Sequence, residues 1–111
     1  MNNQDYTFGL KLWSTNAHYR QEAVRLFDQR TFDYLELFIE PHSYDGHAAH
    51  WAGLDIPYVI HAPHYDKGLN LAVKTQCDQN LSLAREAIRF ADLLHADTII
   101  FHPGIEGDIT E

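Results

Sequence analysis

The sequence predicts an α/β fold in which four parallel strands are covered by helices. Short apolar segments begin near Phe8, Asp33, Pro57 and Asp97, and segments with helical periodicity separate them. Strands that alternate with helices usually form a parallel sheet with right-handed crossovers. The spacing suits the βα units of a barrel and also an open doubly wound sheet, although no G-x-G-x-x-G dinucleotide fingerprint follows any strand.

The first half of the chain carries two strands and one clear helix. Residues 8–13 and 33–39 alternate apolar side chains with others at a period of two, which is typical of strands. A helix is predicted over residues 17–30, with Asn16 as its N-cap. The stretch after the second strand is irregular, with a short helix expected near residues 48–53.

The second half contains a long helix between two further strands. The strands are predicted at residues 57–61 and 97–101, and the helix at residues 74–95. Apolar positions on the helix step by four and three residues, which predicts that one stripe packs against the sheet and that its cysteine is a core residue. This stripe is Cys77, Leu81, Ala84, Ile88 and Ala91, widened by Ala87 and Leu94.

Length and composition indicate one globular domain over residues 1–111. The chain has 45% hydrophobic and 22% charged residues, which are ordinary values for a folded protein. A single cysteine excludes an internal disulfide framework, and no apolar run is long enough to span a membrane. The first residues do not resemble a signal peptide, so a cytoplasmic location is expected. The net charge of −8 argues against general nucleic-acid binding, which depends on Lys and Arg.

The strand ends carry the candidate functional residues. In parallel βα folds, sites form at the C-terminal ends of the strands. Trp13 follows the first strand and His42 the second, while His61 and His64 follow the third and His102 the fourth. We therefore expect Trp13, His42 and His64 to contact a substrate.

His61 and His102 are the candidate metal ligands. Each ends or directly follows a buried apolar strand, and neighbouring parallel strands lie ~4.8 Å apart, so two imidazoles there can reach one ion. The expected cofactor is a divalent metal, zinc or manganese. Capping histidines that bond backbone carbonyls are the alternative. His47 and His50 lie near His42 without a standard zinc spacing, which favours an exposed or substrate-lining loop.

Two charged residues are candidate catalytic groups. Glu36 lies in the middle of a strand and points away from the helices if the leucines beside it face them. It is then a general base or a partner of a metal ligand, or else a structural ion pair with Lys11 of the neighbouring strand. Lys67 lies in a turn-rich loop and is a candidate for binding a phosphate or carboxylate, with Asn70 as a further substrate contact.

Three segments together resemble the xylose-isomerase-like TIM-barrel superfamily. They are IHAPHYDKGLNLA, NLSLAREAIRFADLLHA and DTIIFHPG, and the resemblance covers residues 8–104, most specifically 61–104. This superfamily includes sugar-phosphate isomerases and epimerases and the endonuclease-IV-type apurinic endonucleases. The resemblance implies that the chain is a (β/α) half-barrel, the N-terminal half of an eight-stranded barrel, either as part of a longer protein or as a half that pairs with another copy.

The resemblance implies three alternative functions. The first is a sugar or sugar-phosphate isomerase or epimerase that depends on a metal in its complete form. The second is a zinc metallohydrolase acting on abasic DNA, in which His61 and His102 match zinc ligands. In that branch a Tyr usually follows H-x-P, where this chain has His64, and a G-x-H follows the first strand, where this chain has Gly9-Leu10-Lys11. The third is a non-catalytic half-barrel that functions by oligomerisation.

A homo-oligomer is expected whichever function holds. Four strands cannot close a barrel of this type, so two strand edges and one sheet face remain open. A two-fold dimer of half-barrels is the simplest way to cover them.

Overall fold

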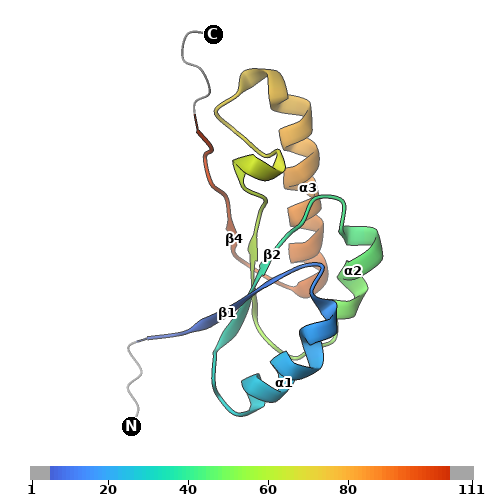
Figure 1. Ribbon diagram of the computed structural model, residues 1–111, viewed down its shortest axis with the longest axis vertical. Coiled ribbons are helices and arrows are strands. Elements are labelled where there is room, and N and C mark those ends of the chain that lie inside the picture. The colour runs from blue at the N-terminus through green and yellow to red at the C-terminus, as the bar shows by residue number, and fades with distance from the viewer. Residues whose placement is uncertain (1–5, 106–111) are drawn as a thin grey trace.

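The computed structural model describes residues 6–105 and confirms the α/β fold with a four-stranded parallel sheet. The strand order β1-β2-β3-β4 follows the order of the sequence (Figure 1). The strands are β1 (Gly9–Trp13), β2 (Tyr34–Phe38), β3 (Tyr58–His61) and β4 (Ile99–Ile100). A half-barrel is compatible with this order, because consecutive strands of a (β/α) barrel are also neighbours.

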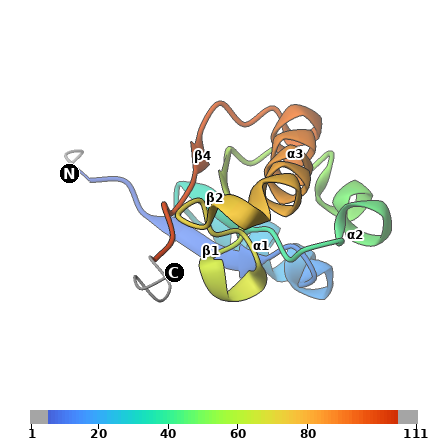
Figure 2. The same cartoon turned by 90° about the horizontal axis from the view of Figure 1, so that it is seen from above.

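Three helices lie on one face of the sheet (Figure 2). They are α1 (Arg20–Asp28), α2 (Tyr44–Trp51) and α3 (Cys77–Leu94), and each belongs to one crossover between strands. Within residues 6–105, none of the helices combines the length and the apolar character that a membrane crossing requires. Short 3-10 turns precede two of the helices within their crossovers. They lie at Ala17–Tyr19 before α1 and at Tyr65–Lys67 and Lys74–Gln76 before α3.

The strand register gives the sheet two chemically different faces. Leu37 lies opposite Ile60, and both are fully buried under the helices. The next residue of each strand, Phe38 and His61, lies on the other face, which we call the open face, because successive side chains of a strand alternate. Alternation and register assign to the open face Lys11, Trp13, Glu36, Phe38, Val59, His61 and Ile100.

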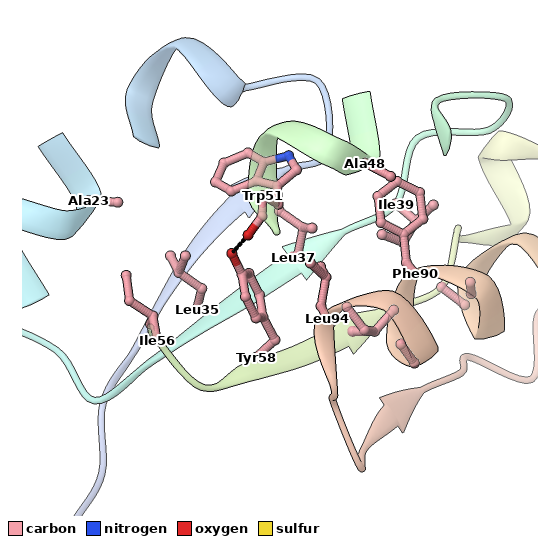
Figure 3. Close-up of a cluster of buried hydrophobic side chains, with 14 of the residues drawn as sticks. Ala23, Leu35, Leu37, Ile39, Ala48, Trp51, Ile56, Tyr58, Phe90 and Leu94 are labelled. Atoms are coloured by element: carbon pink, nitrogen blue, oxygen red, sulfur yellow. Dashed lines mark hydrogen bonds between the residues drawn. The ribbon is translucent and has the colours of Figure 1, made fainter. Parts of the chain in front are cut away.

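Trp51 anchors the helical layer to the strands (Figure 3). Its side chain is fully buried, and its indole N–H donates to the carbonyl of Ser14, 2.8 Å away. The Tyr58 hydroxyl of β3 donates to the Trp51 carbonyl at 2.6 Å, and burial raises the pKa of this phenol. Because these buried polar groups are all bonded, the loop after β1 and the end of α2 are fixed relative to β3.

Several predicted boundaries differ from the structure. The first helix begins as a 3-10 turn and ends at Asp28, and Asn16 does not cap it, because the Asn16 Oδ1 atom accepts from the Trp13 N–H at 2.9 Å. The helix α2 starts at Tyr44, earlier than predicted. The strand β4 contains only two residues, although the Ala62 N–H also donates to the Ile100 carbonyl and extends the pairing.

The buried face of α3 is rotated from the predicted stripe. Leu81 is 46% exposed and Ile88 is 45% exposed, and Cys77 is exposed rather than in the core. A neighbouring stripe that includes Leu83 and Phe90 is buried beside the predicted members Ala87, Ala91 and Leu94, which are buried as expected. Its large member, Phe90, packs edge-on against Tyr44 of α2 with ring centroids 5.1 Å apart. The buried positions of α3 are Asn80, Leu83, Ala87, Phe90, Ala91 and Leu94.

Candidate metal centre

Three histidines converge beyond the C-terminal ends of β3 and β4. The Nε2 atom of His61 lies 3.2 Å from Nε2 of His64 and 2.9 Å from Nε2 of His102. One ligand nitrogen from each ring lies within 4.8 Å of the others, and this is the one such group of three metal-binding side chains within residues 6–105. The predicted proximity of His61 and His102 is confirmed, and His64 joins them.

The sheet positions two of these rings. His61 is the last residue of β3 and is buried, and its register partner on β4 is Ile100. His102 follows Ile100 by two residues, so it points to the same side of the sheet as His61. The rings of His61 and His102 stack with centroids 4.9 Å apart.

His64 reaches the cluster because a short turn follows β3. The segment after His61 remains extended up to His64, which precedes the 3-10 turn Tyr65–Lys67. The His64 ring lies nearly perpendicular to that of His102, at a centroid distance of 4.3 Å. Its pKa is lowered, first by desolvation and then by the neighbouring His102 and His61. A lowered pKa keeps the ring neutral at neutral pH, which is the form that binds a metal.

Glu36 fixes the orientation of His61. Its Oε2 atom lies 2.6 Å from the Nδ1 atom of His61, and both side chains are largely buried. A carboxylate only accepts hydrogen bonds, so we assign the hydrogen to Nδ1, which leaves the Nε2 lone pair directed at the other two histidines. A carboxylate behind a histidine is the usual support of a metal-binding imidazole.

The two nitrogen separations measured from His61 are close to those around a zinc ion. Nitrogens that each lie ~2.0–2.1 Å from a tetrahedral zinc are about 3.3–3.4 Å apart. The two short separations from His61, 2.9 and 3.2 Å, are close to this spacing. Three imidazoles and a supporting carboxylate therefore form a donor set suited to zinc, with a fourth position left for water or substrate.

The structure does not favour the alternative in which these histidines cap backbone carbonyls. The side-chain hydrogen bonds of His61 and His102 within residues 6–105 join them to other side chains rather than to backbone carbonyls. The alternative ion pair between Glu36 and Lys11 is also not formed among the described residues, although the two lie opposite each other in the register. Glu36 binds His61 instead.

Two aromatic side chains, Phe38 and Trp13, lie beside the histidine cluster on the open face. The Phe38 ring lies 4.9 Å from His61 and 4.7 Å from His64, measured between centroids, and it is buried. Trp13 lies 5.9 Å from Phe38 and is 40% exposed, so its predicted place beside the site is supported by this contact. The ammonium of Lys11 lies over both rings, at 5.3 Å from Phe38 and 5.9 Å from Trp13. The sequence suggests Lys11 only as an ion-pair partner of Glu36, and the register position opposite Glu36 also places it on this face.

Three other predicted site residues lie outside the histidine cluster. Lys67 pairs with Glu40, with 3.5 Å between Nζ and Oε1. Asn70 is buried, and its side chain donates to the Ile105 carbonyl and accepts from the Ala72 N–H, as expected for a residue that orders a loop. The backbone N–H of His42 donates to Glu86 of α3.

The histidines of the second βα crossover do not form a second centre in the described part of the chain. His50 Nδ1 accepts a hydrogen bond from Arg20 at 2.9 Å, and it is exposed. His47 is half-buried. The exposure of His42 and His50 agrees with the prediction of an exposed loop, and its contact with a substrate stays a prediction.

Comparison of the chain with protein-family models, with curated proteins and with solved structures gave no match.

Proposed function

We propose that this protein is a metal-dependent isomerase or epimerase of sugars or sugar phosphates, with a divalent metal held by His61, His64 and His102. The observation that carries the proposal is the convergence of three imidazole nitrogens at the ends of two parallel strands. Sites of parallel βα folds lie at this edge of the sheet. The resemblance of the residues from 61 to 104 to the xylose-isomerase-like superfamily supports the class of reaction.

Zinc or manganese is the proposed metal. Three imidazole ligands favour zinc, whereas manganese, like magnesium and calcium, prefers oxygen ligands and would draw them from the substrate and water. When bound, such an ion polarises carbonyl and hydroxyl oxygens of a substrate, which eases proton abstraction next to the carbonyl or a hydride shift.

The protein side chains have separable proposed roles. Glu36 is engaged by His61 at 2.6 Å, which supports a positioning role more than that of a free general base. The exposed face of Trp13 is available to stack on the apolar side of a sugar ring. His42 and Asn70 remain predicted substrate contacts, and Lys67 a predicted catalytic group whose partner is now Glu40.

Turnover assays test the proposal. The purified chain is incubated with zinc or manganese and with a panel of free and phosphorylated aldoses and ketoses, and product formation is followed by chromatography. We expect metal-dependent isomerisation or epimerisation of at least one substrate, which is lost after chelation and in His61→Ala. Zinc binding without turnover of any substrate by the chain or its assembled oligomer would reject the reaction class and retain the metal centre.

A zinc hydrolase of the endonuclease-IV type is a second candidate. Three nitrogen ligands and one open position are the arrangement in which zinc activates water. The net charge of −8 makes DNA a poor partner. Cleavage of an oligonucleotide with one abasic site, abolished by chelation, would select this candidate over the isomerase.

The proposed assembly is a homo-oligomer in the cytoplasm. In the described chain, the outer edges of β1 and β4 pair with no other strand, and unpaired edges of this kind invite association. A half-barrel that acts only through such assembly is the non-catalytic alternative, and it predicts an oligomer that lacks metal-dependent turnover.

A further inference from the structure

Lys11 places a positive charge on the open face of the sheet, next to the histidine cluster. It is the one Lys or Arg among the open-face strand residues defined above. No carboxylate of the described residues lies within 4 Å of its ammonium, whereas Lys67 has Glu40 as a partner. The natural partner of Lys11 across the register is Glu36, but that carboxylate is bonded to His61.

The ammonium of Lys11 shares an aromatic support with the metal-binding rings. Phe38 contacts Lys11 at 5.3 Å, His61 at 4.9 Å and His64 at 4.7 Å, each measured to the centre of its ring. The Trp13 ring centre also lies 5.9 Å from the ammonium. Contacts with aromatic faces hold an ammonium in place and leave its N–H donors free for a ligand.

We propose that Lys11 binds the anionic group of the substrate, so that the ligand of this site is a small polyhydroxylated molecule carrying a phosphate or a carboxylate. The proposal rests on the metal centre proposed above and names the substrate class for it. Metal-bound oxygens would lie over the three histidines, and the anionic end of the same molecule would lie over Lys11. The sequence predicted Lys67 as the residue that binds a phosphate or carboxylate, and we propose Lys11 in its place.

The geometry supports Lys11 over Lys67 for two reasons. An ammonium already paired with a carboxylate, as Lys67 is with Glu40, must break that pair to bind an anion. Lys11 lies on a strand, so its backbone is fixed with respect to His61 through two strand pairings, whereas Lys67 lies in a turn. A charge-assisted hydrogen bond from a fixed donor is among the stronger ligand contacts.

Calorimetry with matched ligands tests the proposal. Zinc affinity is measured first, for the unmodified chain, Lys11→Met, Lys11→Arg and Lys74→Met, in which an exposed lysine of another region is replaced. We expect all four to bind zinc alike. The zinc-loaded proteins are then titrated with fructose 6-phosphate, gluconate and fructose, which compare a phosphate, a carboxylate and a neutral molecule.

The expected result is a preference of about tenfold for at least one anionic ligand over fructose, lost in Lys11→Met but kept in Lys11→Arg and Lys74→Met. The preferred ligand distinguishes the phosphate from the carboxylate. No preference in the unmodified chain, or a preference that persists in Lys11→Met, would overturn the proposal while the metal centre stands. A preference lost in Lys67→Met but not in Lys11→Met would assign the anion to Lys67 and overturn it as well.

A failure of the metal centre is separated from a failure of the Lys11 proposal by one further measurement. If the chain binds no zinc, inorganic phosphate is titrated into the metal-free protein and followed by phosphorus NMR. Line broadening that disappears in Lys11→Met supports the anion site alone, and broadening that is equal in both proteins rejects it.

Discussion

The hydrogen bond between Glu36 and His61 determines which nitrogen of His61 is free. With Nδ1 bonded to the carboxylate at 2.6 Å, Nε2 remains to meet His64 and His102. If Glu36 is lost, His61 can rotate or adopt the other tautomer, and its Nε2 lone pair no longer points to the same place as the nitrogens of His64 and His102.

Replacement of Glu36 by Gln is therefore expected to weaken zinc binding by about 10- to 100-fold. The fold should persist, because the amide has the same shape and can still accept from Nδ1. Glu40→Gln removes a nearby carboxylate that pairs with Lys67 and serves as the control. Competition with a chromophoric chelator measures both affinities, and equal affinities for Glu36→Gln and the unmodified chain would show that the carboxylate does not support the ligand.

The sequence allowed two of the three cluster histidines to be predicted as ligands. His61 and His102 stand at the ends of apolar strands, and the parallel order of those strands makes them neighbours. The predicted substrate contact His64 joins them through the conformation of a short turn, which no residue pattern specifies. The sequence also does not determine which residue Glu36 bonds. Lys11 and His61 are both within reach of Glu36, and only side-chain rotamers decide between them.

The helix α3 shows which features of a helix an apolar periodicity cannot predict. The helix carries two apolar stripes with the same step, one through Leu81 and Ile88 and one through Leu83 and Phe90. Periodicity gives the helix and its length but not its rotation about its own axis. The rotation is set by tertiary packing, here by Phe90 packing against Tyr44 of α2 and by Leu83 entering the core.

A pair of substitutions on α3 tests this rotation. Leu83→Asp introduces an unpartnered carboxylate into the core and should destabilise the fold by about 3 kcal/mol or more. Leu81→Asp changes a half-exposed position and should cost no more than about 1 kcal/mol. Urea unfolding followed by circular dichroism compares the two, and a larger loss for Leu81→Asp would restore the originally predicted stripe.

The predicted strands and their parallel order are confirmed, whereas their exact ends are not. The apolar pattern predicts the ends of β1, β2 and β3 to within one residue, because burial of one sheet face requires apolar side chains along each strand. The strand β4 is shorter than its apolar run, since pairing there depends on β3, which ends at His61.

The described sheet has helices on one face only (Figure 2). The other face carries the candidate metal centre together with Trp13, Phe38 and Lys11, and the edges of β1 and β4 lie at the two sides of the sheet. A (β/α) barrel would enclose this face within eight strands. The half-barrel interpretation thus places the proposed site on the side that another half would face.

This arrangement predicts self-association. Light scattering at micromolar concentration should give a mass of at least twice the 12.8 kDa of the chain. Leu12→Pro would perturb β1 itself, and a side chain at Gly9 would collide with the Tyr34 ring. The informative variant is therefore Phe8→Lys, which places a charge at an exposed position directly before the edge strand and should shift the equilibrium toward monomer. A stable monomer of the unmodified chain that binds no apolar dye would contradict the prediction.

Zinc calorimetry tests directly whether His61, His64 and His102 form one metal centre. We predict one zinc ion per chain, with an affinity reduced at least about tenfold in each of His61→Ala, His64→Ala and His102→Ala, because each removes one of three ligands. His18→Ala, which removes an exposed histidine outside the cluster, should bind as the unmodified chain does. Zinc affinity unchanged in all three cluster variants, or equally reduced in His18→Ala, would contradict the claim.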